Sequence, residues 1–510
     1  MRQRRWVIGT AGLAVLLSAC GTRLPDKAFQ KNQQVKLKAS TGALSGGTGS
    51  EQAATGGTGA TQATTTGATQ AVTGGTGGGG TTGGTTTGGT GGPKSPSGQG
   101  NFASDVGVTA DSIKIGNVTA IGGALGPNAF GVTLNGLKTF VSAINDQGGV
   151  NGRKLVLDPC DDGADGTRNL SCTQKLVEQD KVFSLLGNNT DASASSANYE
   201  FKKGIPDVGF PLNNGYYKYP NMYSIYGVGY ARDGKTVGNN GKLENTSGIY
   251  RYFKQQAHAT KAAVFYYIIP VSAQAGCFEE QGALKEGIPT VYEGGGGNGH
   301  CLGAGENPAA PAFDQDVLNM RQAGVDVMFD AMDVSANERL CQAMDRQQFK
   351  VKAKVSTIEV WGDIVGNEFS APCRNSVFVA GLSASYSELS NPMVARFRSD
   401  LSKYGPNYPL HQWTLEGWAL GNEFVEAVKT LGANVTRKGY MGWLEGLNQY
   451  TMNGLFTPLD YRKVDYTKPT NSCNTIAQWQ DSAHKFVTRE PVTYCVTVNY
   501  YTTPALDDGS

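Results

Sequence analysis

The chain has 510 residues, with 44 Lys and Arg against 43 Asp and Glu, so its net charge is only +1. That balance gives no sign of the basic surface that nucleic-acid binding requires. Residues 41–100 contain 22 Gly and 17 Thr, a composition that buries too little apolar surface to fold. The remaining chain of about 410 residues is long enough for two or three globular units, which excludes a small disulfide scaffold.

The N-terminus has the pattern of a secretion signal. Three arginines precede an apolar run over residues 6–17, which is too short to span a hydrocarbon core roughly 30 Å thick. Leu17-Ser18-Ala19-Cys20-Gly21 resembles the lipobox of bacterial lipoproteins, in which cleavage leaves the cysteine as the lipidated first residue. We therefore predict that residues 1–19 are removed and that Cys20 anchors the chain to the cell membrane outside the cytoplasm. The alternative is an ordinary signal that ends near an unrelated cysteine.

Residues 20–100 then form a predicted flexible linker. A Gly/Thr/Ser-rich coil of about 60 residues has a root-mean-square reach on the order of 40 Å. The threonines could also carry O-linked sugars, which composition does not decide.

The folded region begins as alternating strands and helices. Ser112–Val118 alternates like a strand, and apolar residues from Phe130 to Ile144 recur at helical spacing. Further strands are predicted at 154–157, 182–187, 205–208, 262–267 and 325–329, with helices between them and others at 249–256 and 415–427. Continuous apolar strands that alternate with helices indicate parallel sheets covered on both faces. We expect an α/β fold of two doubly wound lobes, with ligand-binding residues just after the strands.

Eight cysteines follow Cys20, and they support a location outside the cytoplasm. None forms a C-x-x-C pair and the chain has four histidines, so we expect disulfides and no metal site. Eight cysteines allow 105 pairings. Their arrangement in four short intervals favours the sequential one: Cys160–Cys172, Cys277–Cys301, Cys341–Cys373 and Cys473–Cys495.

One stretch of the chain has a specific resemblance. Ile113-Lys114-Ile115-Gly116, Phe130-Gly131 and the run INDQGGVNGR at 144–153 are similar to the opening of type I periplasmic binding proteins of the branched-chain amino acid and amide class. The similarity continues through Asp161-Asp162 and 174–187, and more loosely through 324–326 and 340–343. It implies a venus-flytrap fold, in which three strands join two hinged lobes that close on a ligand for an ATP-driven importer.

The resemblance also suggests lobe boundaries. We expect residues 101–256 with about 378–450 to form lobe 1, and residues 257–377 with about 451–510 to form lobe 2.

Residues of lobe 1 are carried over from the family one at a time. Phe130 occupies the place of an aromatic residue that is often tyrosine. Asn189, Thr190 and Asp191 lie in the loop that holds an amino acid's carboxylate, and Asn213 follows the next strand. Asp191 departs from the family serine, and its carboxylate would repel another carboxylate. Asp191 could instead cap a helix that begins near residue 192, and Phe130 could be a core residue.

Residues of lobe 2 match less closely. Asp333, beside Met332, falls near the family's ligand-contacting aromatic residue. Glu359 falls where the family has the acid that binds an ammonium group, with Trp361 beside it. Carboxylates on facing lobes would suit a ligand that bears amine, amide or hydroxyl donors, between the apolar walls of Phe130 and Trp361. Glu359 could instead be a solvated loop residue.

A dense group of tyrosines follows the loop that contains Asn213. They could stack on a ring or sugar, or simply support the packing near the hinge. They are Tyr216, Tyr217, Tyr219, Tyr223, Tyr226 and Tyr230.

Enzyme motifs are missing from the sequence. There is no G-x-S-x-G, Walker lysine or H-E-x-x-H pattern, and residues 294–299 are rich in glycine without the Gly-Lys ending. We expect a monomeric, lipid-anchored solute-binding protein without cofactor that delivers a small polar ligand to an ABC importer. The alternatives are a ligand-sensing or surface-recognition lipoprotein of the same fold, and a structural lipoprotein with a degenerate cleft.

Overall fold

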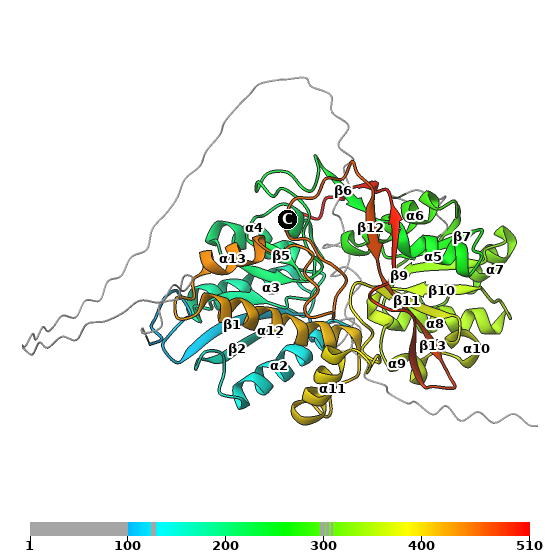
Figure 1. Ribbon diagram of the computed structural model, residues 1–510. Coiled ribbons are helices and arrows are strands. Elements are labelled where there is room, and N and C mark those ends of the chain that lie inside the picture. The colour runs from blue at the N-terminus through cyan, green and yellow to red at the C-terminus, as the bar shows by residue number, and fades with distance from the viewer. Residues whose placement is uncertain (1–99, 124–128, 296–300, 302–304, 308–309) are drawn as a thin grey trace, which may run out of the picture. The chain divides into compact units, whose positions relative to one another are not determined.

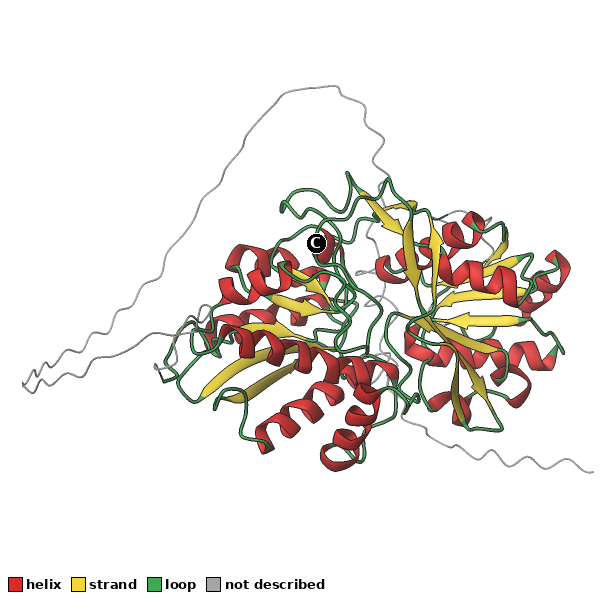
Figure 2. Cartoon of the chain, in the orientation of Figure 1, coloured by secondary structure: helices red, strands yellow, loops and turns green. Residues whose placement is uncertain are grey.

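The computed structural model describes residues 100–123, 129–295, 301, 305–307 and 310–510. The predicted signal, Cys20 and the predicted linker lie outside these residues. The described chain belongs to one compact unit that contains two large sheets, each flanked by helices (Figures 1 and 2).

The first lobe is built on a fully parallel sheet of five strands in the order β2-β1-β3-β4-β5. Leu185 and Leu186 are neighbours in β3 and pack into different apolar clusters, so both faces of this sheet are covered. Its strands are β1 Ser112–Thr119, β2 Lys154–Asp161, β3 Ser184–Leu186, β4 Asp207–Gly209 and β5 Met222–Ser224. Its helices are α2 Gly131–Asp146, α3 Gly166–Gln174, α4 Ala194–Lys203, α11 Pro392–Tyr404, α12 Gln412–Leu431 and α13 Arg437–Glu445.

Helix α12 returns to this lobe, as the sequence predicts, and packs along α2. Glycines allow the close contact, because a Cβ on Gly136 would lie 1.9 Å from the Thr414 carbonyl oxygen, and one on Gly417 would lie 2.1 Å from that of Thr133. The crossing brings the first turn of α12 beside the N-terminus of α2.

The second lobe is built on a seven-stranded sheet in the order β14-β13-β11-β10-β9-β7-β8. Strands β7 to β11 are parallel, whereas β13 and β14 are antiparallel additions from the C-terminal region. Its strands are β7 Ala262–Tyr266, β8 Thr290–Glu293, β9 Val327–Ala331, β10 Ala353–Ser356, β11 Val377–Gly381, β13 Thr475–Gln480 and β14 Lys485–Glu490. Its helices are α5 Gly248–Gln256, α6 Pro270–Lys285, α7 Asp314–Ala323, α8 Val334–Arg346, α9 Ile364–Glu368 and α10 Ala371–Arg374.

Two small ladders complete the described strands. β12 (Thr470–Cys473) pairs with β15 (Cys495–Val498), and β6 (Lys242–Asn245) pairs with β16 (Tyr501–Pro504). The lobe boundaries themselves stay a prediction, although β11 lies in the second sheet while the range expected for lobe 1 resumes near residue 378.

The chain passes between the two lobes after β5, after β11 and after α13 (Figure 1). The last two passages run side by side, since the Ala384 amide donates to the Leu455 carbonyl (2.7 Å) and the Thr457 amide to that of Leu382 (2.8 Å). The passage after β5 also lies beside the passage after α13, because the Val228 amide donates to the Asp460 carbonyl at 3.0 Å. The prediction of two α/β lobes joined by three crossings is confirmed.

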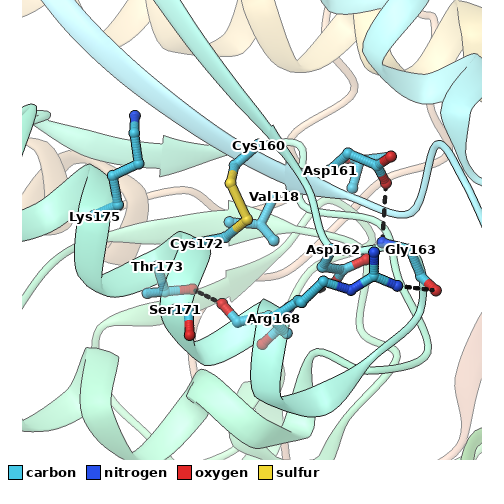
Figure 3. Close-up of a disulfide and its surroundings, with 12 residues drawn as sticks. Val118, Cys160, Asp161, Asp162, Gly163, Arg168, Ser171, Cys172, Thr173 and Lys175 are labelled. Carbon is cyan, nitrogen blue, oxygen red and sulfur yellow. Dashed lines mark hydrogen bonds between the residues drawn. A yellow bond between two sulfur atoms is a disulfide. The ribbon is translucent and has the colours of Figure 1, made fainter.

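The sequential disulfide pairing is confirmed at all four pairs. Cys160 at the end of β2 is bonded to Cys172 in α3 (Figure 3). Just beyond that bond, Asp161 accepts a hydrogen bond from the Gly163 amide at 2.9 Å. The disulfide therefore joins the end of β2 to α3 at the start of the loop between them.

Within the described ranges, no helix is long and apolar enough to cross a membrane.

Candidate functional site

A cavity of about 160 Å³ lies where the parallel strands of both lobes end. Apart from Trp413 in α12, the residues from the first lobe follow β1, β3 and β4. Those from the second lobe lie at or after the ends of β7, β9 and β10, which is where open α/β sheets bind ligands. It is lined by Phe130, Asp191, Leu212, Tyr267, Ile269, Val271, Ser272, Ala275, Ala331, Asp333, Thr357, Ile358, Glu359 and Trp413.

Three carboxylates line this cavity, and none of its lining residues is Lys, Arg or His. Asp191 comes from lobe 1, while Asp333 and Glu359 come from lobe 2. They are close enough for Asp191 and Asp333 both to raise the pKa of Glu359 electrostatically.

Asp191 is held in the cavity without capping a helix. Helix α4 begins at Ala194, two residues after the expected start, and its N-cap is Ser193, so the alternative role of Asp191 as a helix cap is wrong. One carboxylate oxygen, Oδ1, is buried and has no hydrogen-bond partner among the described residues. Burial, with a contribution from Asp162, raises the pKa of Asp191 to about 6.

Glu359 lies in the 3₁₀ turn Ile358–Val360 that follows β10. Burial, and then the charges of Asp333, Asp191 and Asp330, raise its pKa to about 8. The His411 Nε2–H donates to the Glu359 carbonyl at 2.9 Å, while Nδ1 accepts from the Trp413 amide. Burial lowers the pKa of His411 to about 4, so the ring carries no charge at neutral pH. The carboxylate of Glu359 therefore has no cationic neighbour from that side.

Asp333 has partners of its own. It is the N-cap of α8, where its side chain accepts from the amides of Ser335 and Ala336, and it also accepts from the Tyr267 hydroxyl. Behind it, the buried Lys354 is paired with Asp330 at 2.6 Å. The buried Lys354 of this lobe is thus already neutralised.

Aromatic and aliphatic side chains form the other walls. Phe130 and Trp413 stack with ring centroids 5.6 Å apart, at the crossing of α2 and α12. Phe130 is 3% exposed, so the core and cavity-wall interpretations both hold for it. Leu212, Ile269 and Val271 supply aliphatic surface.

Four of the predicted site residues do not line this cavity. The Asn189 side chain donates to Thr133 at 2.7 Å, and the Thr190 hydroxyl donates to Asp162 at 3.2 Å. Asn213 donates to Ser193 and lines a neighbouring cavity of about 130 Å³ that shares Leu212, Val271 and Ala275 with the first. Trp361 is fully buried against Phe486, because its ring turns into the second lobe's core.

Trp413 and Tyr267 are cavity residues that the sequence analysis missed. Tyr267 directly follows β7, so the rule of looking after strands could have found it. Trp413 lies in a helix far from any strand end, and no sequence signal marked it.

The tyrosine group supports packing. The Tyr216 hydroxyl donates to Asp207 (2.9 Å), that of Tyr223 to Glu445 (3.0 Å) and that of Tyr226 to Glu416 (2.6 Å). None of the six lines the cavity between the carboxylates.

Residues 112–485 match the periplasmic binding protein family. The chain belongs to this family. Its similarity to solute-binding proteins of the branched-chain amino acid ABC transporter type is therefore shown, and membership indicates a location outside the cytoplasm.

One curated relative is similar to this chain over most of its own length. A Leu/Ile/Val-binding protein homolog 1 of Brucella abortus (strain 2308) is 23% identical over 317 residues, which cover 61% of this chain and 76% of the relative.

Solved structures share the fold. A fatty acid ABC transporter substrate-binding protein from Thermomonospora curvata has a TM-score of 0.60 at 16% identity and covers 76% of this chain and 93% of its own. A branched-chain amino acid ABC transporter protein from Thermus thermophilus with bound valine has a TM-score of 0.58 at 12% identity, over 76% and 97%. A solute-binding protein from R. palustris in complex with benzoate gives 0.56 at 13%, over the same shares. The last two of these structures hold valine and benzoate, respectively.

Proposed function

We propose that this protein is a lipid-anchored solute-binding protein that captures a small ligand between its two lobes and delivers it to an ABC importer. The observation that carries the proposal is the cavity between the strand ends of both lobes, in a chain of the periplasmic binding protein family. A ligand that touches both lobes binds the closed form more tightly and so shifts the population toward it.

The anchor rests on the sequence. Two acyl chains on Cys20 would hold the chain at a membrane, because each buried methylene contributes about 0.8 kcal/mol. Incorporation of labelled palmitate into the wild-type chain but not into Cys20→Ala, with release of the variant from membranes, is the expected result. A wild-type chain that takes up no label would remove the anchor from the proposal.

Ligand capture is tested first by thermal unfolding of the purified full-length chain against amino acids, amides, amines, sugars and aromatic acids. A ligand at 100 times its dissociation constant adds about 2.7 kcal/mol to the free energy of unfolding. Import is tested next: cells that lack the protein should take up that ligand more slowly, and the wild-type gene should restore uptake. Binding with unchanged uptake would favour a sensor, and no binding of any kind would favour a structural lipoprotein.

A further inference from the structure

The cavity combines three carboxyl groups with aromatic and aliphatic walls, and none of its lining residues is Lys, Arg or His. We propose that its ligand is an amphiphilic amine that lacks a carboxylate, rather than a zwitterionic amino acid. This inference rests on the proposed function, since it names the ligand class of the same cavity.

Two oxygen atoms in the cavity wall are unused as hydrogen-bond acceptors in the described part of the chain. Asp191 Oδ1 and Thr357 Oγ1 line the cavity, and both atoms are buried without a hydrogen-bond partner among the described residues. Leaving buried polar atoms unpaired costs about 1–3 kcal/mol each, so they point to a partner that arrives with a ligand. An ammonium group offers three donors and no acceptor, which suits both atoms.

Carboxyl groups approach the cavity from both lobes. Asp162 and Asp191 approach from lobe 1, and Asp330, Asp333 and Glu359 from lobe 2, while Lys354 is paired with Asp330 and His411 is neutral. At pH 8 and above, where Asp191 is ionised and Glu359 begins to ionise, a ligand carboxylate would meet these like charges with no cation to receive it, and juxtaposed like charges cost several kcal/mol. An ammonium group would be attracted by the same charges.

Two side chains of lobe 1 that could donate to a ligand carboxylate already donate to other residues. In the loop after β3 the Thr190 hydroxyl donates to Asp162, and Asn189 donates to Thr133. These donors are turned away from the cavity.

The remaining walls of the cavity are mostly apolar. Phe130 and Trp413 present aromatic surface, and Leu212, Ile269 and Val271 present aliphatic surface, so an apolar chain or ring would be buried favourably. Aromatic faces also attract a nearby cation. The cavity of about 160 Å³ limits the ligand to a small molecule.

The test compares ligands that share one carbon skeleton. Isoamylamine is leucine without its carboxylate, and 4-methylpentanoate is leucine without its amine; 2-phenylethylamine, phenylalanine and 3-phenylpropanoate form a second triple. Calorimetry on the purified full-length chain at pH 8 should show at least one amine binding more tightly than its amino acid by about tenfold or more, with no binding of the acid. Leucine or phenylalanine binding as tightly as its amine would overturn the inference and leave the proposed function standing.

Variants locate the effect in the cavity. Glu359→Gln and Asp191→Asn keep the side-chain shape, and each should weaken amine binding by about tenfold or more. Asp111→Asn makes the same change of charge at the exposed start of β1, at the opposite end of the strand, and should bind as the wild type does. Equal amine binding by all three variants would overturn the inference.

Proton release gives an independent readout. Binding a cation favours ionised Glu359, so the amine's association constant should rise by up to about tenfold per pH unit between pH 6 and 8. Calorimetry in buffers of different ionisation enthalpy should detect the released proton. An affinity that falls as the pH rises over this range would contradict an amine ligand.

If no compound of either triple binds, the amine inference fails. Binding of some other compound in the wider panel would still support the proposed function.

Discussion

Asp333 has two roles that a single substitution can separate. Its carboxylate caps α8 through the amides of Ser335 and Ala336, and it also faces the cavity. Asp333→Ala should lower the free energy of unfolding by about 1 kcal/mol, because the first-turn amides lose their acceptor. Asp333→Asn retains an acceptor oxygen, so most of that stability should remain in urea unfolding. Equal destabilisation by both variants would mean that the cap contributes little.

Helix α12 holds a cavity residue far from the strands that supply the others. Its closeness to α2 depends on glycine, since a Cβ on Gly417 would lie 2.1 Å from a carbonyl oxygen. Gly417→Ala should therefore force the helices apart, cost about 1–3 kcal/mol of stability and weaken ligand binding by moving Trp413 from Phe130.

The matched control for this prediction is Gly442 in α13. A Cβ there meets no heavy atom within 4 Å, and alanine in a helix interior is favoured over glycine by roughly 0.5–1 kcal/mol. Gly442→Ala should be neutral or stabilising in the same unfolding experiment. A loss of stability as large as that of Gly417→Ala would show that the helix crossing is not the cause.

Strands were predictable from the sequence where every residue along the strand is buried. Apolar runs at 182–187 and 262–267 predicted β3 and β7 because parallel strands buried on both faces leave little room for polar residues. The additions β13 and β14 were not predicted, since antiparallel pairing with β11 depends on contacts distant in sequence.

The site residues were predictable only in part, because side-chain direction depends on contacts distant in sequence. Phe130, Asp191, Asp333 and Glu359 lie at strand ends or next to the first helix, where topology alone brings residues together. Trp361 and Glu359 are two residues apart, but the turn after β10 directs the tryptophan into the lobe's core. Side-chain direction in such a turn is set by tertiary packing, which spacing does not report.

At the scale of the whole molecule, the C-terminal tail connects both lobes near the cavity. The Leu506 amide donates to Gln274 of α6 (2.8 Å), and the Asn214 amide, after β4, donates to Asp508 (2.6 Å). A chain that ends at Pro504 should unfold at a temperature lower by a few degrees and release ligand faster, because fewer contacts join the lobes. Asp507→Ala, which removes an acceptor for Gly509 within the tail, is the control and should change neither quantity. Unchanged ligand release after truncation would exclude a role for the tail in lobe movement.

Buried carboxyl groups occur in both lobes, and they predict how stability depends on pH. Burial is the largest cause in each case, raising the pKa of Asp207 and Glu416 to about 7, and of Glu359 and Glu423 to about 8. Between pH 6.5 and 8 the folded protein therefore retains protons that the unfolded chain, with ordinary carboxyl pKa values near 4, has already lost. Stability falls with rising pH wherever the folded state binds more protons.

Groups whose ionisation makes stability rise with pH titrate mainly below pH 6.5. His411, with a pKa of about 4 when folded, adds stability as the pH rises toward 6.5 but changes little above it. Asp326 has a pKa of about 2, so its contribution is lost only in acid. From pH 6.5 to 8, the unfolding midpoint of the unliganded protein should fall by several degrees, since each retained proton contributes a slope of about 1.4 kcal/mol per pH unit. Glu423→Gln, which cannot ionise, should flatten this fall. A midpoint that is constant or rises with pH would mean that these carboxyl groups ionise in the folded protein with ordinary pKa values.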